Sequence, residues 1–301
     1  MTKTDPESGT EGMIVCQNLT KQFGDLTAVD NINLNINTGE LFGFLGPNGA
    51  GKTTTIKMLI GLLRPTSGIC RIGGFDVTEQ PLEARRVFGY IPDNPFLYEK
   101  LTGREFLHFM ADLYSVSPQN REAHIQDLLT LLDLQDKGND LIGGYSRGMR
   151  QKIALAGALI HTPRVIFLDE PTVGLDPRGA RTMRDILREM CRRGTTVFIS
   201  THILEIAERL CDRVAIVNKG RMIAMGTMEE LRRMTQMARP QLSGQSIPPE
   251  HSELSEQSDP SKLSDSSMFD ADRKVPPTSL EDIFLQLTGN AEYADPAQYL
   301  T

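Results

Sequence analysis

The feature that most constrains the fold is the octapeptide Gly46-Pro-Asn-Gly-Ala-Gly-Lys-Thr53, which fits the pattern G-x-x-x-x-G-K-[ST]. It directly follows the apolar run 41–45 and directly precedes the helix-patterned run 54–63. In this context the glycines let backbone N–H groups converge on phosphate oxygens, and the helix N-terminus adds its positive dipole. The sequence therefore predicts a strand, a phosphate-binding loop and a helix in direct succession.

The side chains of this loop predict a nucleoside triphosphate site with a divalent cation. Lys52 can reach the β and γ phosphates, and the Thr53 hydroxyl can ligate Mg²⁺. The predicted nucleotide-binding residues of the loop are Gly46, Pro47, Asn48, Gly49, Ala50, Gly51, Lys52, Thr53 and Thr54.

Two carboxylates end the apolar run Val165-Ile-Phe-Leu-Asp-Glu-Pro171. Ligands of α/β sheets collect at the C-terminal ends of buried strands. Asp169 is predicted to hold Mg²⁺, and Glu170 is predicted to orient or deprotonate the attacking water. One carboxylate alone would also fit a solvated strand end, but the phosphate-binding loop favours the catalytic interpretation.

Over most of the first 235 residues, short apolar or β-branched runs alternate with helix-patterned segments. This alternation favours an α/β sheet whose strands are joined by helical crossovers. The last three predicted strands are nearly continuous apolar runs, which is typical of a parallel sheet buried on both faces. The predicted strands are 13–19, 28–36, 41–45, 87–91, 165–168, 196–200 and 214–217.

Between residues 102 and 144 the pattern becomes wholly helical. Apolar side chains recur with helical spacing at Phe106, Phe109, Met110 and Leu113, and again over residues 128–134. We therefore expect a helical subdomain at about residues 102–160, inside a nucleotide-binding domain of residues 13–237.

The two ends of the chain differ in composition from this domain. Residues 1–12 are polar and acidic, without the apolar segment of a secretory signal, and we expect them to be disordered. Residues 238–277 contain nine Ser and six Pro, which predicts a disordered insert. In residues 278–301, Leu280, Ile283, Phe284 and Leu287 predict a short amphipathic helix that docks on the main body, followed by a tail.

Composition excludes several classes of function. A net charge of −7 argues against a large nucleic-acid footprint, and no uncharged run approaches the roughly 18 apolar residues that a membrane-spanning helix needs. The four cysteines lack the C-x-x-C spacing of zinc sites and are expected to be reduced thiols. We therefore expect a cytoplasmic protein that does not cross a bilayer by itself.

Together with the motifs above, several further motifs are similar to those of the ATP-binding subunits of ABC transporters, and the resemblance covers about residues 13–235. Phe23 stands where that family stacks an aromatic ring on adenine. Gly174-Leu-Asp-Pro177 resembles the family's D-loop, which implies that Asp176 lies across a dimer interface. Ser200-Thr-His202 resembles the switch histidine, which implies that His202 hydrogen-bonds the γ-phosphate.

Tyr145-Ser-Arg-Gly-Met-Arg-Gln151 occupies the place of the family's LSGGQ signature. Ser146 can cap a helix that begins near Met149, so that its hydroxyl, the Gly148 N–H and the helix dipole form an anion site. In the family this site faces the γ-phosphate held by the other subunit. Arg147 replaces a glycine and Met149 replaces the glutamine, whereas Ser146 and Gly148 are retained, so we expect a modified but working signature.

Asp93, in Tyr90-Ile-Pro-Asp-Asn94, is the clearest departure, because the family usually has a glutamine there. A carboxylate can serve a hard cation such as Mg²⁺, but it adds negative charge near the triphosphate. The following residues 95–105 and the C-terminal Leu280-Glu-Asp-Ile-Phe284 are similar to relatives that serve ABC-2-type exporters.

The resemblance implies an α/β fold: a P-loop NTPase of the ABC ATPase type, with an N-terminal antiparallel β subdomain and a helical signature subdomain. It further implies an ATPase that uses ATP and Mg²⁺, with Glu170 and His202 as catalytic residues. ATP-driven dimerisation, with a second copy or a homologous subunit, would power a separate transmembrane permease, in an exporter. The chain would then lie peripherally on the cytoplasmic face of the membrane.

Three alternative functions fit the sequence less well. A soluble ABC ATPase that acts on ribosomes or DNA would carry two cassettes or a long coiled coil, and this chain shows neither. A binding-only regulatory subunit is suggested by Asp93 and the altered signature, but the retained Glu170 and His202 argue against it. A P-loop GTPase would need an N-K-x-D motif, and Asn218-Lys-Gly-Arg221 ends in the wrong residue.

Overall fold

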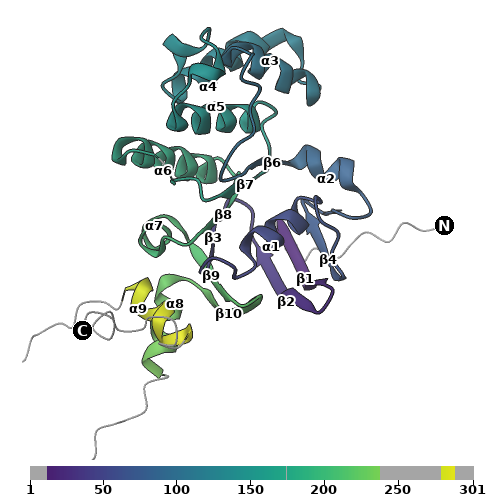
Figure 1. The fold of residues 1–301 in the computed structure, drawn as a ribbon, viewed down its shortest axis with the longest axis vertical. Coiled ribbons are helices and arrows are strands. Elements are labelled where there is room, and N and C mark those ends of the chain that lie inside the picture. Colours follow the sequence, from purple (N-terminus) through teal and green to yellow (C-terminus); the bar gives the residue numbers. More distant parts are fainter. Residues whose placement is uncertain (1–11, 174, 238–278, 289–301) are drawn as a thin grey trace, which may run out of the picture.

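The computed structural model describes residues 12–173, 175–237 and 279–288, and within them the chain forms two β-sheets with helices around them (Figure 1). The larger sheet has the strand order β10-β9-β3-β8-β7-β6. Its strands are β3 (Leu41–Leu45), β6 (Phe88–Ile91), β7 (Val165–Asp169), β8 (Thr196–Thr201), β9 (Arg213–Asn218) and β10 (Arg221–Gly226).

The central strands of the larger sheet are parallel, as their continuous apolar runs predicted. Alternate residues of these strands enter different cores, because side chains of a strand point to opposite faces. Phe42, Phe44, Phe167 and Phe198 pack together on one face, with ring centres 5.5–5.8 Å apart for the contacting pairs. Leu41, Leu168, Val197 and their neighbours enter the core on the other face.

The smaller sheet is antiparallel, with the order β2-β1-β4-β5, as expected for an N-terminal β subdomain. It consists of β1 (Ile14–Phe23), β2 (Leu26–Ile36), β4 (Ser67–Ile72) and β5 (Phe75–Asp76). The sequence prediction missed β4, β5 and β10, because these short strands contain exposed, polar or glycine residues and lack a long apolar run. Helix α1 (Lys52–Leu59) lies between the two sheets and contributes Ile56, Met58 and Leu59 to their common core.

On the opposite side of the larger sheet lie α3 (Gly103–Leu113), α4 (Arg121–Leu131), α5 (Arg147–Leu159) and α6 (Pro177–Arg192), with short 3₁₀ turns at Pro118–Asn120, Gln135–Lys137 and Ile142–Gly144. Helix α5 contacts β6 and helix α6 contacts β3 and β8, whereas α3 and α4 pack on α5 at the top of the view (Figure 1). Thr102 and Glu105 form a capping box at the start of α3, which accounts for the point at which the helical pattern begins. Helix α2 (Pro81–Val87) ends where β6 begins, one residue after the predicted start of that strand.

The helix predicted from the spacing of Phe106, Phe109, Met110 and Leu113 is confirmed as α3, but these side chains differ in burial. Phe106 is 5% exposed and belongs to the core, but Phe109 is 41% exposed and Leu113 is 66% exposed. The helix is therefore apolar on its solvent-facing side as well as toward the core. The predicted helical segment 102–160 holds α3, α4 and α5; its treatment as a separate unit stays a prediction.

The C-terminal amphipathic helix was predicted correctly. Helix α9 (Leu280–Thr288) packs with α7 (Leu204–Leu210) and α8 (Met228–Met237), and Leu280 and Ile283 are fully buried. The Leu280 N–H donates to Glu208 of α7 at 3.3 Å. The predicted insert, residues 238–277, and all but one residue of the predicted N-terminal tail lie outside the described residues.

Candidate active site

The glycine-rich loop lies between β3 and α1, so the predicted strand–loop–helix unit is confirmed. Gly46 leaves no room for a side chain, since a Cβ there would lie 2.3 Å from the Val217 carbonyl oxygen. Gly51, the residue before α1, has a φ of 98°, a conformation that favours glycine. The Gly220 N–H donates to the Ala50 carbonyl at 3.1 Å, and this bond ties the loop to the β9–β10 turn.

Lys52 extends its ammonium group back along the loop. Its Nζ donates to the carbonyl oxygens of Gly46 at 2.7 Å and Pro47 at 3.2 Å, and it lies 3.8 Å from Oε1 of Glu170. Burial lowers the pKa of Lys52, whereas the carboxylates of Glu170 and Asp169 act to raise it. The lysine thus brings a buried ammonium group into the phosphate-binding loop.

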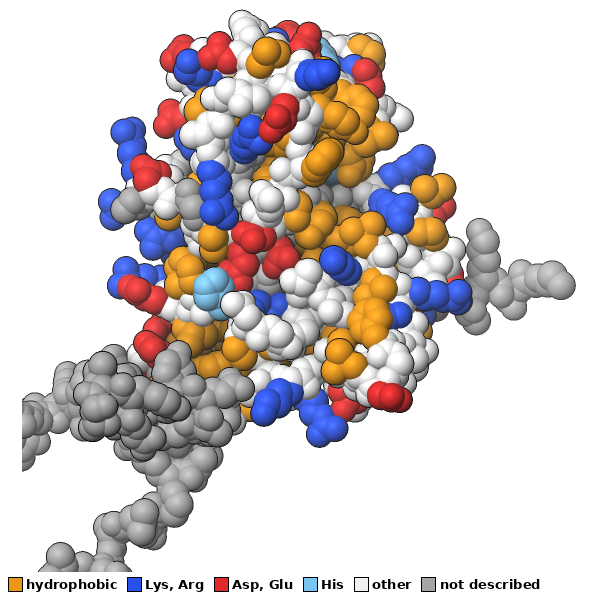
Figure 2. Space-filling view, viewed as in Figure 1, with side chains coloured by type: hydrophobic (Ala, Val, Ile, Leu, Met, Phe, Trp, Pro, Cys, Tyr) orange, Lys and Arg blue, Asp and Glu red, His pale blue; other side chains and the backbone are white. Residues whose placement is uncertain are grey.

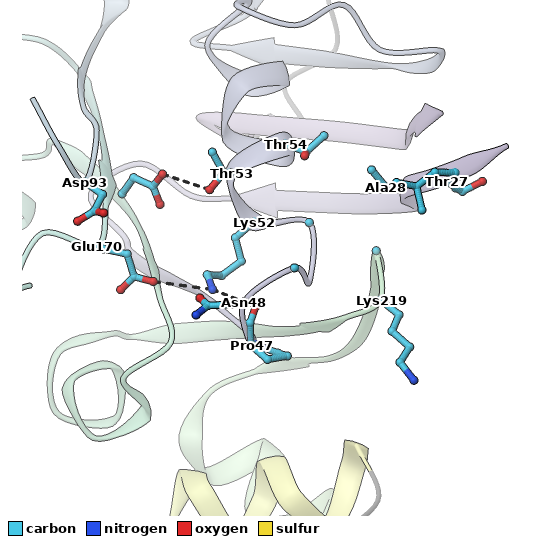
Figure 3. Close-up of a pocket in the computed structure, with 15 residues that line it drawn as sticks. Thr27, Ala28, Pro47, Asn48, Lys52, Thr53, Thr54, Asp93, Glu170 and Lys219 are labelled. Carbon is cyan, nitrogen blue, oxygen red and sulfur yellow. Dashed lines mark hydrogen bonds and ion pairs between the residues drawn. The ribbon is translucent and has the colours of Figure 1, made fainter. Parts of the chain in front are cut away.

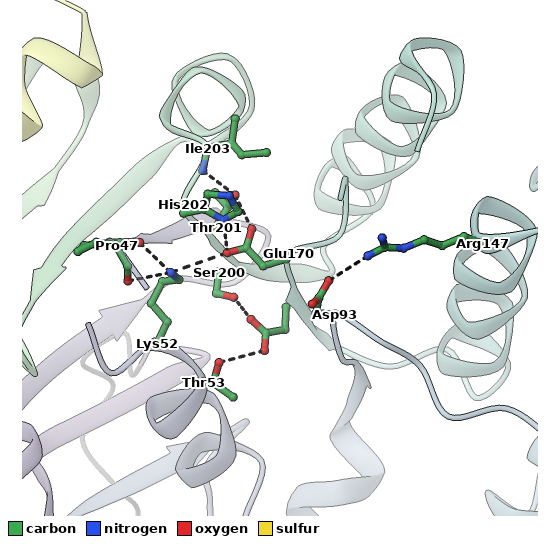
Figure 4. Close-up of polar contacts among 12 residues, drawn as sticks. Pro47, Lys52, Thr53, Asp93, Arg147, Glu170, Ser200, Thr201, His202 and Ile203 are labelled. Atoms are coloured by element: carbon green, nitrogen blue, oxygen red, sulfur yellow. Dashed lines mark hydrogen bonds and ion pairs between the residues drawn. The ribbon is translucent and has the colours of Figure 1, made fainter. Parts of the chain in front are cut away.

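Asp169, the last residue of β7, lies opposite Ser200 of β8 in the parallel register. The Ser200 hydroxyl donates to its Oδ1, and the Thr53 hydroxyl donates to its Oδ2 at 3.4 Å (Figure 4). Burial raises the pKa of Asp169, and the charges of Glu170 and Asp93 raise it further, while the two hydroxyl donors act in the opposite direction. A cation beside this carboxylate would relieve the repulsion.

Glu170 has a φ of 50°, in the left-handed region that a glutamate rarely adopts. Its carboxylate is held by two residues that follow Ser200: the Thr201 hydroxyl donates to Oε2 at 3.0 Å, and His202 Nδ1 lies 2.8 Å from Oε1 (Figure 4). Backbone strain of this kind concentrates at functional sites. The strained residue here is the one predicted to act on the attacking water.

These groups surround a cavity of about 510 Å³ (Figure 3). In the space-filling view, acidic side chains gather in a hollow near the middle of the face, beside a histidine (Figure 2). The loop residues Pro47, Lys52, Thr53 and Thr54 line the cavity, as do Asp93, Asp169 and Glu170. The sequence analysis had not identified its far end, which consists of Leu26, Thr27, Ala28, Lys219 and Gly220.

Phe23, the predicted adenine partner, is not among the residues that line this cavity. It is 49% exposed near the end of β1, and Lys21 Nζ lies 5.0 Å from the centre of its ring. Leu26, which pairs with Phe23 across the β1–β2 turn, lines the cavity instead. The stacking of Phe23 on adenine stays a prediction.

The signature residues lie outside the cavity, on the surface. Ser146 caps α5 by accepting a hydrogen bond from the Met149 N–H at 3.3 Å, so the predicted cap is confirmed, although the helix begins at Arg147 rather than near Met149. Gly148 follows in the first turn of the helix. Asp176 is exposed and caps α6, accepting from the Gly179 N–H at 3.0 Å. Gly174 lies outside the described residues.

The roles of Ser200 and Thr201 in the site were not predicted from the sequence. Ser200 bonds Asp169, and Thr201 bonds both Glu170 and the Ile203 N–H at 3.0 Å. A signal was present, because both hydroxyl residues end a strand that precedes His202. Their partners followed only once β8 was known to lie beside β7 in parallel register.

The comparisons with known proteins agree with this geometry. Residues 29–173 match the protein family described as ABC transporter. The chain is 41% identical over 215 residues to the daunorubicin resistance ATP-binding protein DrrA3 of Streptomyces coeruleorubidus, covering 71% of this chain and 68% of that protein. It is 40% identical over 215 residues to the Nod factor export ATP-binding protein I of Burkholderia lata, covering 71% of each.

A solved structure has a similar fold: the dimeric post-hydrolysis state of the ATP-binding cassette MJ0796 bound to ADP and Pi. Its TM-score is 0.66 at 26% identity, and the match covers 71% of this chain and 98% of that one.

The position of Lys52 generates a first prediction. Lys52→Ala should weaken ATP binding by roughly tenfold to a hundredfold, because a hydrogen bond to a charged group contributes about 1.5–3 kcal/mol. Titration calorimetry of ATP into the two proteins measures the change. Lys219→Ala is the matched control, since Lys219 is exposed at the opposite end of the same cavity and points away from Lys52 (Figure 3). An equal loss of ATP affinity in the two variants would contradict the assignment of Lys52 to the phosphates.

Proposed function

We propose that this chain, which belongs to the ABC transporter family of ATP-binding proteins, hydrolyses ATP at the carboxyl edge of its parallel sheet to power an exporter. The family makes the chain an ATP-hydrolysing transporter subunit. The observation that carries the catalytic assignment is the convergence of Lys52, Asp169 and a strained Glu170 on one cavity. Export is supported by relatives such as the Nod factor export protein.

The donor set fits Mg²⁺. Among the described residues no group of three or more His, Cys, Asp and Glu side chains could hold a metal ion by itself. Mg²⁺ is usually bound by one or two carboxylates together with substrate phosphates, and it prefers oxygen ligands. The Thr53 hydroxyl and the Asp169 carboxylate, which are 3.4 Å apart, would hold the ion, with Asp93 at the cavity wall as a further oxygen donor. When bound, Mg²⁺ neutralises charge on the phosphates.

Glu170 is assigned as the base that orients and deprotonates the attacking water. Thr201 and His202 fix its carboxylate from one side, and Lys52 lies 3.8 Å away on the other. The histidine therefore acts by positioning Glu170 and by hydrogen-bonding the γ-phosphate with its other ring nitrogen. Lys52 would exchange its loop carbonyls for phosphate oxygens.

The signature of this chain is assigned to bind the γ-phosphate held by a second copy of the chain or by a homologous subunit. Ser146 and Gly148 lie on the surface at the start of α5 and outside the cavity, so they are available to a phosphate held by another subunit. The helix N-terminus there favours an anion. Asp176 is exposed and would lie at the same interface. The relative MJ0796 forms a dimer bound to ADP and Pi, which supports this arrangement.

The binding of the permease is assigned to an exposed patch of three aromatic residues and one leucine, called here the aromatic patch: Phe96, Tyr98, Phe109 and Leu113. Their exposed fractions are 93%, 51%, 41% and 66%, and the rings of Tyr98 and Phe109 meet edge to face at 5.3 Å. Figure 2 shows hydrophobic side chains gathered on this face of the helical segment. Apolar patches of this kind mark interaction sites. By binding the permease, the patch would hold the chain at the cytoplasmic face of the membrane. None of the helices in the described residues could cross a bilayer.

Replacing the base generates the second prediction. Glu170→Gln should lower ATP turnover by about a hundredfold or more and leave ATP bound, since proton-transfer assistance typically contributes that much. Phosphate release measures turnover, and calorimetry measures binding. Wild-type turnover in the variant would remove Glu170 from the chemistry, and a wild-type chain that binds ATP without turning it over would favour the regulatory-subunit alternative.

The third prediction concerns the sandwich. Mg-ATP should double the mass of Glu170→Gln protein in light scattering, because one subunit alone leaves the γ-phosphate half enclosed. Adding Ser146→Glu should abolish the doubling, since its carboxylate would face the γ-phosphate. The same substitution at the exposed Ser117, which lies near the C-terminal end of α5 and not at its start, serves as the control. A single mass with and without nucleotide, at saturating ATP, would contradict ATP-driven dimerisation.

The fourth prediction tests the aromatic patch. Phe96→Ser should reduce recovery of the permease with the tagged chain from detergent-solubilised membranes by roughly tenfold, because aromatic side chains dominate interface energetics. Leu62→Ser is the control, since Leu62 is 64% exposed after α1. ATP turnover of the isolated variants should match wild type. Recovery of ribosomes in place of a polytopic membrane protein would favour the soluble ABC ATPase.

A further inference from the structure

The two residues that depart most clearly from the family pattern, Asp93 and Arg147, meet in the structure. Asp93 lies in the loop after β6, and Arg147 is the first residue of α5. Arg147 Nη2 lies 3.7 Å from Asp93 Oδ1, and Figure 4 shows the two side chains pointing toward one another. The pair therefore joins the cavity wall to the signature helix.

The charges around Asp93 are predominantly negative. Asp169 and Glu170 line the same cavity, and the charge of Asp93 is close enough to contribute to the raised pKa of Asp169. Of the lysines that line the cavity, Lys52 is engaged by loop carbonyls and Glu170, and Lys219 lies at the far end (Figure 3). Arg147 is thus the cation that the structure places against Asp93.

The pair is half exposed, with 61% of the Arg147 side chain and 50% of the Asp93 side chain accessible. Ion pairs at such exposure contribute little to stability and are screened by salt. The pair can therefore open when either partner is offered a stronger one. Its effect lies in where it places charge: an unpaired carboxylate at position 93 would repel the triphosphate held by the adjacent loop.

We propose that Arg147 is a positioning residue for Asp93. It neutralises and orients the carboxylate on the side of α5, so that Asp93 does not oppose an incoming triphosphate, and it yields Asp93 to Mg²⁺ when the metal nucleotide binds. The proposal rests on the proposed function in one respect, since it takes the cavity as the triphosphate site.

A double-mutant cycle on ATP binding tests the pair without hydrolysis. In EDTA and at low salt, Arg147→Gln should weaken ATP binding by about threefold, because it leaves the negative charge of Asp93 unpaired at the wall of the cavity. In the Asp93→Gln background the same change should cost less than about 1.5-fold, since that charge is already gone. Arg147→Lys should restore the wild-type affinity. The coupling should fade at about 0.5 M salt.

Lys137→Gln is the matched control. Lys137 forms an ion pair of similar exposure with Asp140 in the same helical segment, 55% and 52%, and neither residue lines the cavity. Lys137→Gln should leave ATP affinity unchanged. An equal loss in this variant would show a general effect of surface charge and would overturn the proposal.

The Mg²⁺ dependence of turnover supplies a second readout. Arg147→Gln should lower the free Mg²⁺ concentration at half-maximal turnover, because the arginine no longer competes for Asp93, and Asp93→Gln should remove the difference. Independent effects of the two substitutions in both measurements would overturn the proposal. A wild-type chain that does not bind ATP would instead overturn the proposed function, so the two failures are distinguishable.

Discussion

The site depends on the parallel register of β3, β8 and β7. Leu45 pairs with Thr201 and Asp169 pairs with Ser200, so the three strands end at one level of the sheet. At this level the phosphate-binding loop follows β3, Asp169 and Glu170 stand at the end of β7, and Ser200, Thr201 and His202 stand at the end of β8. A slip of one residue would turn the side chains of a strand to the other face. The buried phenylalanines on one face and aliphatic residues on the other prevent such a slip.

Within this frame the balance of charge organises the side chains. The carboxylates of Asp93, Asp169 and Glu170 line one cavity and repel one another. Arg147 limits this repulsion at Asp93, the Ser200 and Thr53 hydroxyls limit it at Asp169, and Lys52 and Thr201 limit it at Glu170. Burial raises the pKa of Asp169 and lowers the pKa of Lys52, since each environment disfavours the charged form. A site of this kind gains most from ligands that supply both a divalent cation and phosphate oxygens.

Much of this could be predicted from the sequence, because the chemistry is local. The Gly46–Thr53 loop, the cap at Ser146 and the helix at Leu280 each depend on residues within one turn or one strand, and the structure confirms these local features. The contact of Asp93 with Arg147 depends on where α5 packs, and the contact of Glu170 with Thr201 depends on which strands are neighbours; local patterning does not contain that information. Phe109 and Leu113 fit the helical period but face solvent, since periodicity cannot distinguish a buried face of a helix from an exposed apolar one.

Asp93 of the ion pair and two residues of the exposed aromatic patch, Phe96 and Tyr98, lie on one short segment between β6 and α3. Asp93 and Phe96 are three residues apart, and Leu97 between Phe96 and Tyr98 is anchored in the core at 8% exposure. If the proposed function holds, a permease that displaces Phe96 would also displace Asp93, which is held by the half-exposed ion pair with Arg147. A weak pair is suited to this position, because an interaction of several kcal/mol would resist the small displacement that a partner can impose. Arg147 belongs to the helix that begins at the signature, so the same displacement would alter the charge presented to the other subunit.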